Sequence, residues 1–240
     1  MSLPDSASAV SWKEMQAFFP HRRIANHIRP LPDEGVVYVK NPKAGCSTIL
    51  VWLDRIHTGE FDHVFTNIHK QHRLPDVKEV GRGKVVRMLS GDAYRFSFVR
   101  NPVRRFESVY WDKIVHKRHR WRSGTGGSLA MDVEPGAVVS FEQFLTAVEH
   151  QDPLSEMDPH WRPQHINLMH PLVTYDRVGR LEDFDAELEI IREEAGLPQV
   201  PHQVRNPSKK MASDSVFANR PDLLRRVEQI YAEDMELYGY

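Results

Sequence analysis

The feature that most constrains the fold is a strand, a short loop and a helix in succession near the start of the chain. Residues 36–39 form an apolar, β-branched run that predicts a buried strand. A turn that contains proline and glycine follows, and apolar residues then recur at helical spacing over residues 49–56. A strand, a loop and a helix in this order are typical of an α/β domain with a parallel sheet.

Further apolar segments extend this alternation along the chain. Three more strands are expected, at residues 84–89, 96–99 and 172–175, with residues 178–181 extending or following the last one. Apolar residues at helical spacing predict helices over residues 11–19, 102–114, 141–148, 184–195 and 221–235. The alternation predicts one α/β domain, residues 1–240, with a mainly parallel sheet and helices on both faces.

Composition and charge narrow the classes of protein that fit. The chain has 240 residues, of which 40% are hydrophobic, so one domain with a substantial core is expected. The net charge of -1 argues against binding a polyanion by bulk charge, and we expect no nucleic-acid partner. The single cysteine, Cys46, excludes a disulfide within the chain. No apolar run approaches the ~20 residues that span a bilayer. We therefore expect a cytoplasmic protein without an integral membrane segment, or the soluble part of a membrane-anchored enzyme.

The loop at residues 41–48 has the composition of an anion-binding site. A loop between a strand and a helix presents backbone N–H groups and the positive end of the helix dipole to a ligand. Gly45 lets the backbone approach that ligand closely, Lys43 adds a positive charge, and Ser47 and Thr48 add hydroxyl donors. The Walker A loop places its lysine after its second glycine, whereas here the lysine precedes the only glycine.

A second candidate anion site follows the strand expected at residues 96–99. Arg100 stands at the end of that strand, where its guanidinium can form paired hydrogen bonds with phosphate oxygens. Ser108 lies on the helix predicted to follow. Residues 100–122 contain eight lysine or arginine residues and two acids, so this segment is strongly positive within a nearly neutral chain. Taken alone, such a run favours a solvated basic helix face over a binding site.

Together, the two loops resemble the PAPS-dependent sulfotransferases. The motifs that carry the resemblance are Pro-Lys-x-Gly-x-Ser-Thr at residues 42–48 and Arg-Asn-Pro-x-x-Arg-x-x-Ser-x-Tyr-x-x-Lys at residues 100–113. The chain is most similar to the carbohydrate branch, which comprises Golgi-type and bacterial enzymes, from about residue 36 to about residue 208. The resemblance implies a P-loop-like three-layer sandwich and PAPS, 3′-phosphoadenylyl sulfate, as co-substrate.

The resemblance also assigns roles to individual residues. It implies that the first loop holds the 5′-phosphosulfate of PAPS through Lys43, Ala44, Gly45, Cys46, Ser47 and Thr48. It implies that Arg100 and Ser108 hold the 3′-phosphate. Further similar stretches, at residues 158–164, 175–182 and 205–208, would supply acceptor and nucleotide contacts, and Arg205 is the nucleotide contact expected from the last of them. Lys43 is also expected to act in catalysis, by neutralising charge on the leaving phosphate oxygen.

An acceptor hydroxyl needs a base, and histidine suits this role because its unperturbed pKa is about 6.5. His69 is the first choice, because it lies between the two phosphate motifs, where related enzymes often place a base. His72 is close enough in sequence to compete. His160 is the third candidate, with orientation of the acceptor as its alternative role. The scheme requires no divalent metal, and none is expected.

The expected acceptor is a carbohydrate, because the basic residues 100–122 and the glycine-rich loop at 121–135 suit a sizeable, anionic molecule. A small hydroxylated metabolite or a lipid remains open as the acceptor. Two other classes of protein remain open. A nucleotide-dependent kinase with a variant phosphate loop would need Mg²⁺ ligands and a Walker lysine. A non-catalytic module that binds anionic glycans through residues 100–122 would not need two separate phosphate loops.

Overall fold

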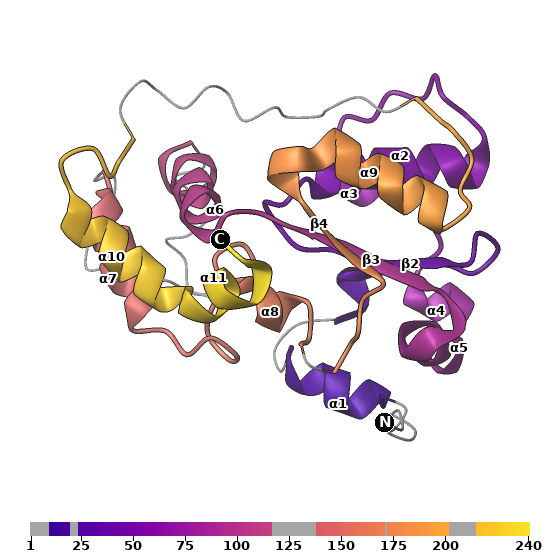
Figure 1. Cartoon of the computed structure of the whole chain (residues 1–240), viewed down its shortest axis with the longest axis horizontal. Coiled ribbons are helices and arrows are strands. Elements are labelled where there is room, and N and C mark those ends of the chain that lie inside the picture. The colour runs from indigo at the N-terminus through magenta and orange to yellow at the C-terminus, as the bar shows by residue number, and fades with distance from the viewer. Residues whose placement is uncertain (1–9, 20–23, 117–137, 171, 202–214) are drawn as a thin grey trace.

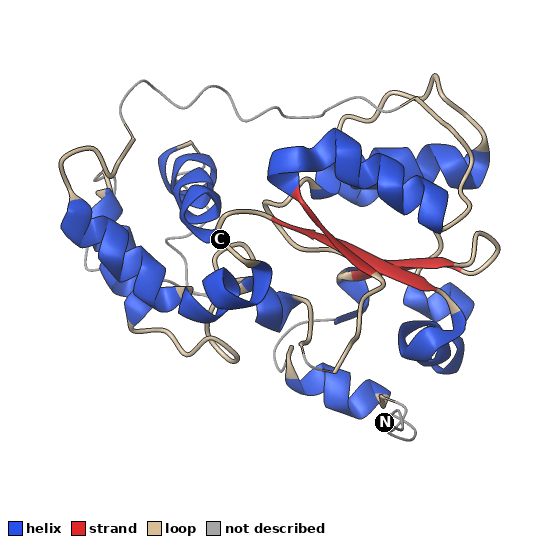
Figure 2. Ribbon diagram, in the orientation of Figure 1, coloured by secondary structure: helices blue, strands red, loops and turns tan. Residues whose placement is uncertain are grey.

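The computed structural model describes residues 10–19, 24–116, 138–170, 172–201 and 215–240. A four-stranded sheet lies between layers of helices (Figures 1 and 2). Its strands are β1 (Ile28–Leu31), β2 (Val36–Val39), β3 (Tyr94–Val99) and β4 (Arg177–Arg180), in the order β1-β2-β3-β4. β1 pairs with β2 in the antiparallel direction, whereas β2, β3 and β4 are parallel. The predicted P-loop-like α/β class with a mainly parallel sheet is confirmed.

One face of the sheet packs against α2 (Cys46–Thr58) and α9 (Phe184–Glu194), as Figure 1 shows. Tyr38 and Phe96 point to this face and share a buried cluster with residues of α2 and with Leu188 of α9. Side chains alternate between the two faces along a strand, so every second residue of β2 and β3 contributes to this layer.

The other face packs against α1 (Trp12–Ala17), α4 (Val77–Val80) and α5 (Arg82–Arg87). Val37 and Val39, the alternate residues of β2, are fully buried in this second cluster. Apolar residues therefore occupy both faces of β2, as expected for a central strand covered by helices on two sides.

A third cluster lies beside the sheet and contains helix and loop residues but no strand residue among those described. It joins α6 (Pro102–Val109), α7 (Phe141–Glu149) and α10 (Pro221–Ile230). A π-helical turn at Tyr110–Val115 continues α6. The remaining short helices are α3 (Ile68–Gln71), α8 (Gln164–Asn167), α11 (Ala232–Tyr238), 3-10 turns at Ile24–Asn26 and Leu181–Asp183, and a π-helical turn at Met88–Asp92.

Local capping explains where two of these helices begin. Asn101 accepts a hydrogen bond from the Arg104 backbone N–H at 3.1 Å, and Pro102 occupies the first turn of α6. Ser140 and Gln143 form a capping box at the start of α7. The predicted starts of these helices, at residues 102 and 141, are confirmed.

Two predicted strands are wrong. Residues 84–89 form the end of α5 and the start of the π-helical turn, because Val85, Met88 and Leu89 follow helical spacing and are all buried. Residues 172–175 belong to no strand among the described residues. β4 spans Arg177–Arg180 and so largely coincides with residues 178–181, which were expected to extend or follow that strand.

The last predicted helix is divided into two. The backbone of Tyr231 departs from helical geometry between α10 and α11. The predicted glycine-rich loop at 121–135 lies outside the described residues. Among the residues that are described, no helix has both the length and the apolar character needed to cross a membrane.

Candidate active site

The candidate site forms where the carboxyl ends of β2 and β3 lie side by side. The Ser97 hydroxyl on β3 donates to the Val39 carbonyl at 2.7 Å. The Asn41 side chain, just beyond β2, donates to the Phe98 carbonyl at 3.0 Å. Ligands of parallel α/β sheets bind beyond the carboxyl ends of the strands, so this edge is the expected place for a nucleotide.

The loop after β2 has the backbone of an anion cradle. Lys43 and Gly45 both have left-handed backbones, with φ of 71° and 77°. A Cβ atom on Gly45 would lie 2.9 Å from Leu181 Cδ1, so glycine also allows the close approach of the segment after β4. α2 begins at Cys46 without a side-chain cap, which leaves N–H groups of its first turn to bind an anion.

The other residues of this segment differ from one another in how deeply they are buried. Ala44 is fully buried and Thr48 nearly so, whereas Cys46 and Ser47 are half-buried. The Ala44 N–H donates to the Asn41 carbonyl at 3.3 Å, and the Thr48 N–H donates to the Gly45 carbonyl at 3.0 Å. The loop predicted at residues 41–48 therefore ends at Gly45, and Cys46, Ser47 and Thr48 form the first turn of α2. The contacts of these residues with a nucleotide remain predictions.

The Lys43 ammonium is fixed by a carboxylate from the second motif. Its Nζ lies 3.1 Å from Asp112 Oδ2, and Lys113 Nζ lies 3.6 Å from the same oxygen. Burial lowers the pKa of Lys43, the charge of Asp112 opposes this shift, and the positive charge of Arg100 adds to it. Lys43 and Arg100 come from different loops, but the charge of Arg100 is close enough to influence the protonation of Lys43.

Arg100 is held by its backbone. Gln164, which is fully buried, accepts from the Arg100 N–H at 3.0 Å and donates to the Arg100 carbonyl at 2.8 Å. Within the described residues, the half-buried Arg100 guanidinium takes part in no hydrogen bond or ion pair. Burial lowers the pKa of Arg100, and the negative charge of Glu182 opposes this shift. The side chain is thus positioned without a carboxylate bound to it, as a phosphate ligand requires.

Ser108 and Arg205 are less well defined as nucleotide contacts. Ser108 is half-buried on α6, the helix that begins just after Arg100, and no hydrogen bond within the described residues joins its hydroxyl to Arg100. Arg205 lies outside the described residues. The helix predicted to follow Arg100 is therefore confirmed. The contacts of Ser108 and Arg205 with the nucleotide remain predictions.

His69 contacts the donor loop. Its Nε2 lies 3.0 Å from the Ser47 hydroxyl, so α3 meets the start of α2 at this point. His69 as a whole is exposed, yet partial burial of its side chain, followed by electrostatic interaction with Lys40 and His160, lowers its pKa to about 4. His72 lies one residue beyond α3, and burial lowers its pKa below the ordinary value.

His160 lies in the segment before α8 and is paired with a buried carboxylate. Its Nδ1 lies 2.5 Å from Asp158 Oδ1. Burial lowers the pKa of His160, Asp158 opposes that shift, and the positive charges of Lys113 and Lys43 reinforce it. His160 in turn contributes to the shift of His69, so the two histidines and Lys43 are brought together.

Arg105 is a residue whose importance the sequence did not reveal. Its side chain is 1% exposed, and its guanidinium donates to the carbonyls of Pro42 at 3.0 Å, Pro159 at 2.9 Å and Arg162 at 2.9 Å. It therefore ties the donor loop to the segment that carries His160. Its place as the second arginine of the Arg-Asn-Pro-x-x-Arg motif was the available signal, but a charge in a basic run gives no indication of burial.

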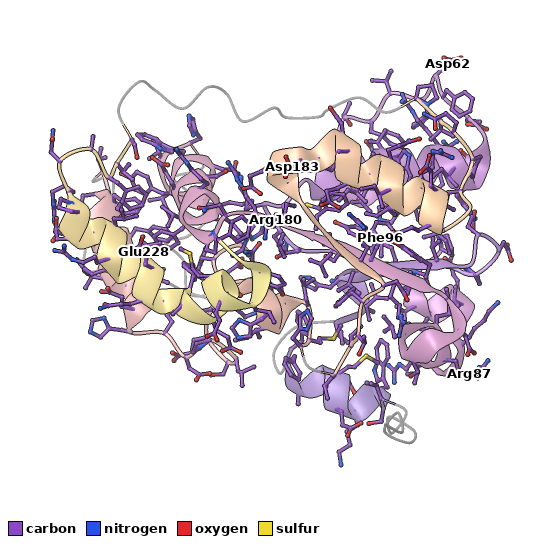
Figure 3. All side chains as sticks on the ribbon, viewed as in Figure 1. Asp62, Arg87, Phe96, Arg180, Asp183 and Glu228 are labelled. Atoms are coloured by element: carbon purple, nitrogen blue, oxygen red, sulfur yellow. The ribbon has the colours of Figure 1, made fainter. Side chains whose placement is uncertain are left out.

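The C-terminal residues cover the end of β4 next to this site. Arg180, labelled in Figure 3, lies over the Tyr240 ring at 5.0 Å and donates to the Gly239 carbonyl at 3.1 Å. Glu182 accepts from the Tyr240 hydroxyl at 2.9 Å and from the Asn101 N–H at 2.8 Å. Glu182 thus connects the chain end to the residue that follows Arg100. Glu182 itself is exposed.

The site has two separate cations, Lys43 and Arg100, each of which can bind one anionic group. His69 and His160 lie on the Lys43 side. Among the described residues, no group of three or more histidine, cysteine or acidic side chains is placed to hold a metal ion.

Comparison with known proteins identifies the class. The profile of the Sulfotransferase family matches residues 26–240, and the chain belongs to that family. Carbohydrate sulfotransferase 14 of Homo sapiens is 28% identical over 207 residues, which cover 79% of this chain and 51% of the relative. The Mus musculus protein of the same name is 28% identical over 244 residues, 91% of this chain and 61% of the relative. Carbohydrate sulfotransferase 9 of Homo sapiens is 24% identical over 177 residues, 68% of this chain and 40% of the relative.

The chain spans about half to three fifths of the length of these carbohydrate sulfotransferase 14 relatives. No solved structure gives a significant match.

Proposed function

We propose that the protein transfers a sulfuryl group from PAPS to a hydroxyl of a carbohydrate and releases adenosine 3′,5′-bisphosphate. The observation that carries the proposal is the pairing of the Lys43 loop and Arg100 at the ends of two adjacent parallel strands. Two anion sites on one sheet edge fit a donor that carries anionic groups at both its 3′ and 5′ positions. Family membership and the named relatives support the donor and the acceptor class.

In this proposal the donor lies across the two loops. Lys43, Gly45 and the other residues of the loop bind the 5′-phosphosulfate together with the first turn of α2. Arg100, with Ser108 and Arg205, binds the 3′-phosphate. The Gln164 clamp supports the role of Arg100, because it fixes the backbone while the guanidinium stays available to fork onto phosphate oxygens.

Catalysis then depends on position and charge. Negative charge develops on the leaving phosphate oxygen as the sulfuryl group moves in line to the acceptor. Lys43 neutralises this charge, and its partial burial strengthens the interaction because the effective dielectric constant is lower there than in water. His69 and His160 are the two candidate bases. The scheme requires no divalent metal.

The test compares two nucleotides by calorimetry. We expect the wild-type protein to bind adenosine 3′,5′-bisphosphate in the micromolar range and magnesium-ATP only weakly. Lys43→Ala should weaken binding of the bisphosphate. Arg100→Ala removes a paired, charge-assisted contact worth about 2–3 kcal/mol, so binding should weaken by about 30- to 150-fold.

Arg104→Ala is the matched control, because Arg104 is exposed and carries the same charge near the same loop. It should bind the bisphosphate nearly as well as the wild type does. Equal binding of both nucleotides, or equal affinities in Arg100→Ala and Arg104→Ala, would refute the proposal.

A further inference from the structure

We propose that Asp158 and His160 form a catalytic dyad: Asp158 positions the imidazole, and His160 Nε2 takes the proton from the acceptor hydroxyl. The inference rests on the proposed sulfuryl transfer and assigns its base. His160 touches the acceptor in this scheme and is the catalytic residue. Asp158 acts through His160 and is a positioning residue.

The first argument is the geometry of the pair. Asp158 Oδ1 accepts from the His160 backbone N–H at 2.9 Å and lies 2.5 Å from His160 Nδ1. A carboxylate only accepts hydrogen bonds, so the proton of this contact belongs to Nδ1. The neutral ring therefore carries its lone pair on Nε2, which is the atom needed for a general base.

The second argument is the difference in exposure between the two side chains. The Asp158 side chain is 5% exposed, whereas that of His160 is 32% exposed. The carboxylate is thus closed off from water, whereas the His160 side chain is partly open to solvent. A fixed, buried partner and a partly exposed imidazole side chain together are the arrangement expected of a base that meets an external hydroxyl.

The third argument is the position of the dyad relative to the donor loop. Arg105 donates to Pro42 in that loop and to Pro159, the residue between the two members of the dyad. One buried guanidinium therefore fixes the distance between the dyad and the loop. The positive charge of Lys43 acts on His160, which places the imidazole near the ammonium proposed to contact the leaving oxygen.

The charges around the ring favour the neutral form. Burial is the largest cause that lowers the pKa of His160. Lys113 on the π-helical turn and Lys43 in the donor loop lower it further, whereas Asp158 raises it. The imidazole of His69 on α3 also interacts electrostatically with the ring. At neutral pH the ring is thus ready to accept a proton.

His69, the first choice from the sequence, is placed for another task. Its Nε2 contacts the Ser47 hydroxyl, at the start of α2. That contact ties His69 to the loop proposed to hold the donor. We therefore expect substitution of His69 to change the KM for PAPS more than it changes kcat.

The proposed step balances as follows. The acceptor oxygen forms a bond to sulfur while its proton moves to His160 Nε2. The bond between sulfur and the bridging oxygen of the donor breaks, and its electron pair stays on the 5′-phosphate oxygen beside Lys43. The imidazolium, stabilised by Asp158, then releases its proton to solvent and returns to the neutral form.

The experiment uses the full chain and three variants. Asp158→Asn keeps the shape of the side chain and removes its charge, and His160→Ala removes the base. Asp152→Asn is the matched control, because Asp152 hydrogen-bonds Ser155 within a turn of the same segment and lies on an exposed surface. Transfer of ³⁵S-sulfate from labelled PAPS to hyaluronan and to dextran reports activity, and calorimetry with adenosine 3′,5′-bisphosphate reports donor binding.

We expect Asp158→Asn and His160→Ala to bind the bisphosphate within about twofold of wild type, as Asp152→Asn does, and to lose kcat by about 100-fold or more. Added imidazole should restore activity to His160→Ala. In Asp158→Asn, the acidic limb of kcat/KM should move to lower pH, because Asp158 is the group that raises the pKa of His160. A purely structural role for Asp158 would predict neither result.

Two outcomes would overturn the dyad while leaving the proposed function intact. One is near-normal kcat in His160→Ala by a protein that still binds the bisphosphate. The other needs no acceptor: long-range ¹H–¹⁵N spectra that place the proton of neutral His160 on Nε2. Failure of the wild type to bind the bisphosphate would instead refute the proposed function itself.

Discussion

Arg105 offers a quantitative test of how the donor loop is held against the rest of the site. The Arg105→Met variant keeps most of the side-chain volume but removes the three hydrogen bonds to the carbonyls of Pro42, Pro159 and Arg162. Each buried acceptor left unpaired costs about 1–3 kcal/mol. Removing a buried guanidinium also relieves its desolvation, which offsets part of this loss. We expect a net decrease of about 3–5 kcal/mol in the free energy of unfolding.

The neighbouring residue supplies the control. Arg104 lies on the same helix but is exposed, and its nearest ion pair, to Glu107 Oε2, is 3.8 Å long. Exposed pairs contribute about 0–1 kcal/mol, so Arg104→Met should change the free energy of unfolding by no more than that. Urea unfolding of both variants, monitored by tryptophan fluorescence, measures the difference. Similar urea midpoints for the two variants would show that the three hydrogen bonds make no net contribution and would refute the reasoning.

Two further predictions concern stability. Gly45→Ala and Gly59→Ala each place a Cβ on a left-handed backbone, at a cost of about 1–2 kcal/mol, but only Gly45 has a neighbour in the way, with Leu181 Cδ1 at 2.9 Å. Gly45→Ala should therefore unfold at lower urea concentration and bind adenosine 3′,5′-bisphosphate more weakly; equal midpoints would contradict the close packing. His27 is buried, and burial followed by the charge of Lys40 lowers its pKa well below 6.5. Because only the unfolded chain takes up this proton, stability should fall as pH drops below about 6.5, by at most about 1.4 kcal/mol per pH unit, and His27→Gln should flatten that slope in pH-dependent urea unfolding. If His27→Gln and the wild type show the same dependence of unfolding free energy on pH, the pKa of His27 is not lowered by folding.

The parts of the fold that the sequence predicted correctly depend on local patterns. The strand at residues 36–39, the helix starts at residues 102 and 141, and the donor loop each need only a few adjacent residues to be identified. The segment at 84–89 failed because adjacent valines favour a strand locally, while burial of Val85 and Met88 on one helical face decides the structure. Tertiary packing overrode the local preference there.

The long-range hydrogen bonds that hold the site together could not be predicted from local sequence patterns. Asn41 donates to Gln164 across 123 positions of sequence, and Arg105 reaches Pro159 across 54. Contacts of this kind depend on how three buried clusters are arranged, and no residue in the chain signals its distant partner. The candidate histidines show the same limit, because spacing favoured His69, whereas only the folded chain reveals the Asp158 contact of His160.

The left-handed backbone of Lys43 bears on attempts to engineer a more robust enzyme. At a φ of 71°, a residue with a side chain costs about 1–2 kcal/mol relative to a right-handed conformation. Glycine would relieve that cost, so a library screened only for thermal tolerance would enrich the loss of this lysine. Variants selected in this way would lack the Lys43 ammonium that we propose for catalysis. Selection at this position therefore needs an activity readout, because here tolerance to heat and turnover favour different residues.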